Sequence, residues 1–201
     1  MSAAAHEGNG GDDERGSAVP SSDPFAAASI VRLGLEQAAA YRALLLEAYE
    51  AHPEAFRSTV AERAELPLAW WERRLADPAA PDDGVFGALV AGRLVGVVGL
   101  SFERREKCRH QGRLFGIYLQ REARGRGLGH RLVEAALAAA RARPGTRVVQ
   151  LTVSERNGSA QRLYADCGFV PFGVEPLAIR VGDQFLAKVH MACDLDAAPE
   201  R

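Results

Sequence analysis

Hydrophobic positions recur with two different periods along the N-terminal part of this chain. Residues 29–33 form a short apolar run of the β type, and residues 36–51 carry alanine and leucine at helical spacing. Residues 56–76 contain Pro67, which interrupts a helix, and predict two short helices with a break between them. The pattern therefore predicts one strand followed by three helices.

Two hairpins are predicted from apolar runs that are bounded by turn residues. The first joins strands at residues 85–90 and 94–102 through a turn at residues 91–93. The second closes the chain with strands at residues 169–172 and 184–193. Hairpins on both sides of the middle of the chain indicate a sheet with antiparallel outer strands.

A strand–helix–strand unit lies between the hairpins. An apolar strand ends at Leu119, a glycine-containing loop follows, and helical spacing over residues 128–142 leads to a strand at residues 148–153. Asn157 is a good N-cap for a further helix, and Gly168 suits the residue that ends it. The fold class expected is α/β with α+β character: a mixed, mostly antiparallel central sheet with one parallel strand pair, flanked by helices.

Length and composition predict a single folded domain with two tails. With 201 residues, of which 47% are hydrophobic, the chain can bury one core. Residues 1–24 are small, polar and glycine-rich and predict a disordered tail. Residues 25–196 are expected to form the domain, and residues 197–201 a short C-terminal tail.

Charge and cysteine content argue against several classes of partner. The net charge of -1 gives no basic face for nucleic acid, and no apolar run is long enough to span a membrane. Cys108, Cys167 and Cys193 are odd in number and lack the spacing of metal ligands. We therefore expect no disulfide framework, no metal and a cytoplasmic location.

The loop before residues 128–142 has the composition of an anion site. Gly125, Gly127 and Gly129 allow an anion to approach the backbone, where the start of a helix leaves amide groups unpaired. Positive charge is added at the same place by Arg124, Arg126, His130 and Arg131. The interpretation is a pyrophosphate site.

Two common nucleotide-binding loops fit these glycines poorly. A dinucleotide-binding unit has the spacing G-x-G-x-x-G and an acidic residue at the end of the next strand, whereas this chain has G-x-G-x-G and Glu155 comes late. A P-loop needs Gly-Lys-Ser or Gly-Lys-Thr, and neither follows. The dinucleotide-binding unit stays open as an alternative.

Residues 28–195 resemble the GNAT superfamily of acyl-CoA N-acyltransferases in two motifs. The run RGRGLG at residues 124–129 matches the Q/R-x-x-G-x-G/A loop of that superfamily. Its second signature is matched by Asn157, Leu163, Tyr164, Gly168 and Phe169. The two motifs stand in the right order and are separated by a strand. Arg121 departs from the pattern, because many members carry proline there.

The resemblance implies an acetyl-CoA groove where the strand ending at Leu119 and the strand at residues 148–153 splay apart. The pantetheine arm would pair with backbone groups of Ile117, Tyr118 and Leu119. The pyrophosphate would lie against Arg124, Gly125, Arg126, Gly127, Leu128, Gly129 and His130. Asn157 would be a further cofactor contact.

The resemblance also implies roles in the reaction. Tyr164, on nearly the same helix face as Asn157, would be the general acid that protonates the departing thiolate of coenzyme A. The general base stays open: some relatives carry a glutamate at the position of Thr152, and here Glu103 or His110 is the candidate. The wall opposite coenzyme A would include Phe56, Trp70 and Trp71.

We therefore expect an acetyl-CoA-dependent N-acetyltransferase that transfers the acetyl group directly to a primary amine in a ternary complex. The acceptor would be a small-molecule amine or a protein amine, and the protein would be a monomer or a homodimer. The alternative is a catalytically silent acyl-CoA-binding sensor or structural subunit with the same fold.

Overall fold

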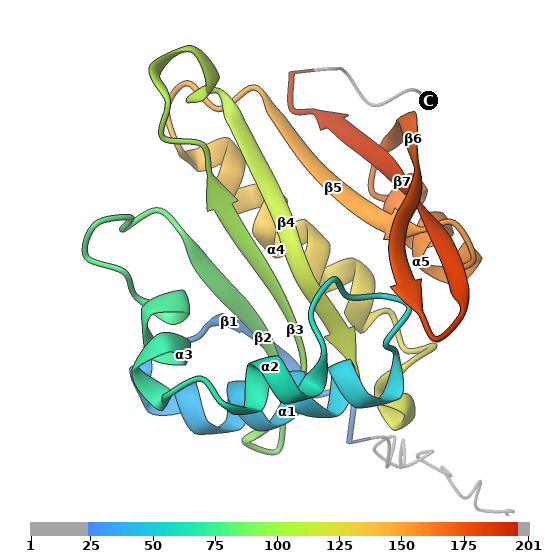
Figure 1. Ribbon diagram of the computed structural model, residues 1–201. Helices are drawn as coiled ribbons and strands as arrows, with labels where there is room; N and C mark the ends of the chain where they lie inside the picture. Colours follow the sequence, from blue (N-terminus) through green and yellow to red (C-terminus); the bar gives the residue numbers. More distant parts are fainter. Residues whose placement is uncertain (1–23, 197–201) are drawn as a thin grey trace, which may run out of the picture.

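The structure, a computed structural model, describes residues 24–196 as a seven-stranded sheet with helices on both faces (Figure 1). The strands are β1 (Ser29–Arg32), β2 (Gly84–Val90), β3 (Arg93–Phe102), β4 (Gln111–Leu119), β5 (Val148–Ser154), β6 (Val170–Val181) and β7 (Gln184–Asp194). The α-helices are α1 (Ala38–Ala51), α2 (Val60–Ala64), α3 (Leu68–Leu75), α4 (Leu128–Ala142) and α5 (Gly158–Asp166). The strand order is β1-β2-β3-β4-β5-β7-β6, and only β4 and β5 pair in parallel within this sheet of described residues. The predicted fold class is confirmed.

The helices form where the apolar spacing predicted them. The chain breaks between α2 and α3 at Pro67, and Thr59 caps α2 by accepting a hydrogen bond from the Glu62 amide at 3.2 Å. The buried face of α4 consists of Leu128, Gly129, Leu132, Val133, Ala136, Leu137 and Ala140. Burying each large side chain contributes about 1.5–3 kcal/mol, so packing on the sheet stabilises α4.

Two clusters of buried side chains hold the helices to opposite faces of the sheet. One cluster joins α4 and α5 to the strands and includes Leu132, Val149 and Met191. The other joins α1 and α3 to the strands and includes Leu45 and Trp71. Figure 1 shows α1, α2 and α3 on one side of the sheet and α4 on the other. Successive residues of a strand therefore face different helices.

The parallel pair β4–β5 is short, and the two strands part beyond it. Pairing joins Gln111–Arg113 to Val148–Gln150 and continues no further along these strands. Residues 114–119 of β4 keep β3 as their neighbour, and residues 151–154 of β5 keep β7. The predicted splay is therefore present, and it leaves one edge of β4 without a strand partner among the described residues.

A bulge in β4 lies where the splay begins. Gly116 and Ile117 together stand opposite the single residue Val98 of β3, because the register shifts between the pairs Val97–Tyr118 and Gly99–Phe115. Gly116 has a φ of 57°, the left-handed conformation that a bulge of this type requires at its first position. Neither the apolar pattern nor the turn residues of the sequence predict this bulge.

The strand predicted at residues 169–172 is wrong in length, since β6 extends over Val170–Val181. The strand continues through Pro171, Gly173 and Pro176, and β6 is an edge strand of the sheet. An edge strand has one side without strand partners, so it tolerates a proline and irregular pairing. The register of β6 against β7 does shift, between Pro171 and Gly173 and again between Glu175 and Ile179.

The two predicted tails, residues 1–24 and 197–201, lie outside the described residues apart from Pro24. Among the helices of residues 24–196, none is both long enough and apolar enough to cross a membrane.

Candidate active site

A groove with a volume of about 580 Å³ opens where β4 and β5 part. It is lined by His52, Glu54, Ala55 and Phe56 of the α1–α2 connection, by Ile117, Tyr118 and Leu119 of β4, by Arg124, Gly125, Gly127, Gly129 and His130 around the start of α4, and by Arg156, Asn157, Ser159, Ala160 and Leu163 around the start of α5. The groove therefore lies between two helix N-termini and the unpaired edge of β4, so backbone donors surround it.

The glycine loop has the geometry of an anion cradle. Gly125 and Gly127 have φ values of 73° and 74°, and a Cβ atom at either position would meet no atom within 4 Å. Gly127 is the N-cap of α4, and its carbonyl accepts the helix's first bond, from the Arg131 amide at 3.1 Å. The amides of the first turn are therefore left for a ligand, and the open space in front of the glycines fits a pyrophosphate.

Gly129 has a packing role as well. A Cβ atom there would lie 3.1 Å from Leu163 Cδ2 and 3.2 Å from Leu119 Cδ1, which is tighter than ordinary contact. The missing side chain lets the start of α4 approach both α5 and β4. The two motifs of the sequence analysis therefore meet at this position.

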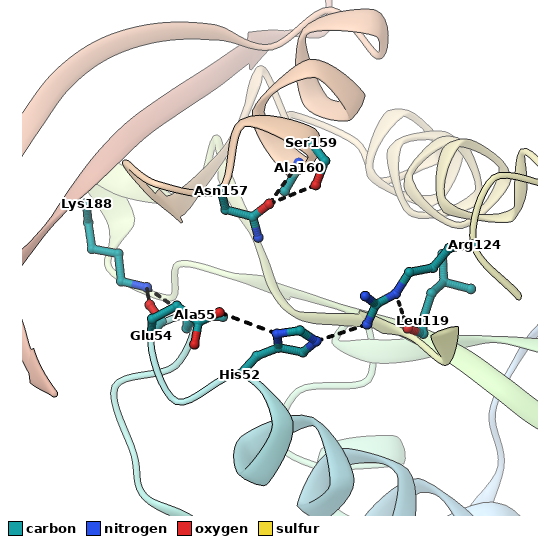
Figure 2. Close-up of polar contacts among 9 residues, drawn as sticks. All are labelled: His52, Glu54, Ala55, Leu119, Arg124, Asn157, Ser159, Ala160 and Lys188. Atoms are coloured by element: carbon teal, nitrogen blue, oxygen red, sulfur yellow. Dashed lines mark hydrogen bonds and ion pairs between the residues drawn. The ribbon is translucent and has the colours of Figure 1, made fainter. Parts of the chain in front are cut away.

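Arg124 is held at the mouth of the groove by a chain of polar contacts (Figure 2). Its Nε donates to the Leu119 carbonyl at 2.9 Å, and its Nη2 lies 3.0 Å from His52 Nε2. His52 Nδ1 in turn lies 3.3 Å from Glu54 Oε1. Since arginine can only donate, His52 Nε2 accepts and Nδ1 carries the proton toward Glu54. The network fixes the guanidinium beside the cradle.

Most of the predicted cofactor residues line the groove. They are Ile117, Tyr118, Leu119, Arg124, Gly125, Gly127, Gly129, His130 and Asn157. The Leu128 side chain is only 1% exposed and belongs to the core beneath α4. Arg126 lies over the ring of Phe25 at 4.2 Å and donates to the Glu122 carbonyl. The Arg126 side chain therefore lies outside the groove lining.

Asn157 caps α5 and faces the groove at the same time. Its Oδ1 accepts hydrogen bonds from the Ala160 amide at 3.1 Å and from Ser159 Oγ at 3.0 Å (Figure 2). Its amide nitrogen forms no hydrogen bond with the described part of the chain. The predicted cap is confirmed, and one donor stays free in the groove wall.

Tyr164 lies one helical turn beyond Ala160 and is 4% exposed. Its ring packs edge-on against Phe169 at 6.0 Å, and its hydroxyl forms no hydrogen bond within residues 24–196. Burial raises the pKa of this hydroxyl, so it holds its proton at neutral pH. Leu163 and Ala160 line the groove and Tyr164 does not, so its role as the general acid stays a prediction.

The structure separates both predicted general bases from the groove. Glu103 is exposed and follows β3, and its amide donates to the Gln111 carbonyl at the start of β4. His110 is exposed and precedes the same end of β4. The groove is at the other end, from Ile117 onward, which is about 20 Å away at the rise of a β-strand. Neither side chain reaches a proton there, so the prediction of a base in this loop is corrected.

The three residues of the predicted substrate wall lie in different places. Phe56 lines the groove and packs against Tyr49 at 4.5 Å between ring centroids. Trp71 is fully buried in the core beneath α3, so its place in the wall is corrected. Trp70 lines a second cavity, of about 450 Å³, together with Arg73, Arg74, Arg113 and Phe115. Adjacent residues of a helix point in different directions, which is why only one tryptophan is buried.

Lys188 is a groove-side residue that the sequence analysis missed. It is 2% exposed, and its Nζ donates to the Ala55 carbonyl at 2.7 Å and lies 3.4 Å from the Glu54 carbonyl (Figure 2). Both carbonyls belong to the connection that lines the groove. A signal was present: Lys188 and His190 alternate with apolar residues in the predicted strand, which puts both on one face.

A second missed cluster lies between α4 and α5. Ligand atoms of His130, Glu134 and Cys167 lie within 4.8 Å of one another. Burial, with a further contribution from Glu134, raises the pKa of Cys167 to about 12. The thiol of Cys167 therefore carries its proton at neutral pH in this environment.

The chain matches the Acetyltransferase (GNAT) family over residues 43–169, which is more than half of its length. Its fold is similar to that of the acetyltransferase of GNAT family from Streptococcus pneumoniae, with a TM-score of 0.70 and 26% identity over 82% of this chain and 97% of that one.

Two further solved structures share the fold at lower identity. The putative acetyltransferase yncA from Salmonella typhimurium, with its cofactor acetyl-CoA, has a TM-score of 0.69 and 22% identity over 86% of this chain and 98% of that one. Ribosomal-protein-alanine N-acetyltransferase from Brucella melitensis has a TM-score of 0.68 and 22% identity over 83% and 99%. Because the match over residues 43–169 includes both motifs that form the groove, the chain belongs to the GNAT acetyltransferase family.

Proposed function

We propose that this protein is an acetyl-CoA-dependent N-acetyltransferase that transfers the acetyl group directly to a primary amine in a ternary complex. The observation that carries the proposal is the groove between β4 and β5, with an open glycine cradle at one end and an unpaired strand edge along one wall. Among proteins of similar fold, yncA is described with acetyl-CoA, and the Brucella protein is named for N-acetylation of alanine.

Different residues of the groove would bind different parts of acetyl-CoA. The first-turn amides of α4 would hold the pyrophosphate, since backbone donors at a helix start favour an anion. The unpaired edge of β4 at Ile117–Leu119 would bind the pantetheine arm as a further strand does. Asn157 would donate its free amide group. Bound acetyl-CoA supplies an activated acyl thioester, and Tyr164 would give the departing sulfur a proton.

Direct transfer is supported by the state of the cysteines. A nucleophilic cysteine needs thiolate character, but burial raises the pKa of Cys167 to about 12 and also raises that of Cys193. Cys108 lies in the β3–β4 connection, at the end of β4 away from the groove. We expect each cysteine-to-alanine variant to keep kcat within about threefold of the parent. A loss above about 10³-fold in one of them would indicate a covalent intermediate instead.

A screen of amines with a free-thiol readout tests the function. The panel would contain amino acids, polyamines, aminoglycosides, and peptides with a free N-terminus or an internal lysine. We expect acetyl-CoA to release thiol with one class of acceptor. Acetyl-CoA binding without thiol release for any of them would favour the alternative, a silent acyl-CoA-binding sensor.

A further inference from the structure

A row of side chains crosses the sheet at the level where β4 and β5 part, two residues before the groove lining of β4 begins at Ile117. Arg113 of β4 pairs with Gln150 of β5, and two residues further along these strands lie Phe115 and Thr152. Thr152 stands directly opposite His190 of β7. Phe115, Thr152 and His190 therefore follow one another across β4, β5 and β7, at the level where β4 and β5 part. Paired strands lie about 4.8 Å apart, so His190 is one strand from the splay.

His190 projects from the face of the sheet that α4 and α5 leave open. Val189 and Met191, its neighbours in β7, are buried in the cluster beneath α4, so His190 points the other way. Lys188 lies on the same face and contacts the Ala55 carbonyl in the groove wall. The His190 side chain is 33% exposed, which leaves it accessible to an acceptor.

A carboxylate and an arginine orient the His190 ring. Glu175 Oε2 of β6 lies 3.2 Å from His190 Nε2, and the same oxygen accepts a hydrogen bond of 2.6 Å from Arg57 Nη2. The ring also packs edge-on against Phe172 at 5.8 Å. With Nε2 donating to Glu175, Nδ1 carries the free lone pair, and no residue in the described part of the chain hydrogen bonds to it.

The charged groups around His190 come from three elements. Glu175 belongs to β6, Arg57 to the α1–α2 connection, and Lys188 to β7 itself, two residues away. The hydrogen bond from Arg57 lowers the pKa of Glu175, so the carboxylate is ionised at neutral pH. A histidine that donates to an ionised carboxylate is held in one tautomer, as a general base requires.

We propose that His190 is the general base of the transfer, a role that rests on the proposed function. Its Nδ1 accepts the proton that the amine nitrogen loses as the C–N bond forms, directly or through one water. The C–S bond breaks, the sulfur takes the proton of Tyr164, and solvent then restores both side chains. Glu175 is a positioning residue, because it acts through the His190 ring.

The test compares His190→Gln with His110→Gln, which removes the histidine at the far end of β4. For the parent and both variants, kcat and KM are measured from pH 6 to 9 by thiol release, and acetyl-CoA affinity is measured by calorimetry. We expect His190→Gln to lose about 10²–10⁴-fold in kcat near pH 7 with unchanged acetyl-CoA affinity, and His110→Gln to stay within about threefold. The deficit should narrow at high pH, where the amine loses its proton unaided, and added imidazole should restore part of the rate.

Two results would overturn the role of His190 without touching the proposed function. One is a His190→Gln variant within threefold of an active parent at every pH. The other is a loss of kcat that is constant with pH, is not rescued by imidazole and accompanies a lower melting temperature. A purely structural role of His190 would give this result. A parent that acetylates no amine contradicts the proposed function itself. Glu175→Gln should show a smaller loss with the same dependence on pH.

Discussion

For Tyr164, a role as proton donor can be distinguished from a role in packing by a single substitution. The residue is 4% exposed and its hydroxyl forms no hydrogen bond with the described residues, so Tyr164→Phe strands no other polar group. We expect kcat to fall by about 10²–10⁴-fold with little change in KM for acetyl-CoA, because only the transferable proton is lost. Thiol-release kinetics and a melting curve on the same variant check this. Near-normal turnover with a clear drop in melting temperature would show a packing role instead.

Lys188 gives a prediction about stability and pH. Burial lowers its pKa, whereas a lysine in the unfolded chain has a pKa of about 10.4. Between the lowered value and about 10.4 the unfolded chain binds more protons, so the free energy of unfolding rises with pH in this window.

The variant Lys188→Met removes that titration. The stability of the parent relative to the variant should therefore increase as the pH is raised through this window toward about 10. Urea unfolding of both proteins at several pH values measures the difference. A difference that does not change with pH would mean that the Lys188 amine is not desolvated in the folded protein.

One glycine in a left-handed conformation precedes helix α4 and another follows it, so the two positions can serve as test and control for the same substitution. Gly127 and Gly145 have φ values of 74° and 80°, and neither has an atom within 4 Å of an added Cβ. Aspartate at either position meets a similar conformational strain of about 1–2 kcal/mol. Only at Gly127 does the carboxylate enter the anion cradle.

We therefore expect Gly127→Asp to lower the affinity for acetyl-CoA by at least about tenfold, which is about 1.4 kcal/mol, and Gly145→Asp to leave it unchanged. Calorimetric titration of the two variants gives the affinities, and urea unfolding checks that they lose similar stability. Equal affinities in two folded variants would remove the cradle from the binding site.

At the scale of the whole molecule, binding in the groove joins segments from both faces of the sheet. Acetyl-CoA at about 100 times its Kd stabilises the folded protein by about 2.7 kcal/mol relative to open states that cannot bind it. Amides that exchange by local opening within residues 117–130 and 156–163 should then slow by up to about 100-fold in hydrogen exchange. The connection at residues 103–110 should be unaffected, and protection there would place the ligand elsewhere.

Local signals in the sequence determined most of the elements and marked the glycine loop of the groove. Helical spacing determined α4, the cap at Asn157 determined α5, and the glycine run marked the cradle, because each is an interaction between residues close in sequence. The sequence also determined the parallel pairing of β4 and β5, because a strand–helix–strand unit almost always forms a parallel pair with a right-handed crossover.

Only the tertiary structure decided which distant side chains meet. His190 and Glu175 are in contact because β6 and β7 pair, and Arg57 joins them from the α1–α2 connection. The distance of His110 from the groove follows from the length and direction of β4. Contacts of this kind depend on strand register and on packing between elements, and no spacing along the chain encodes them.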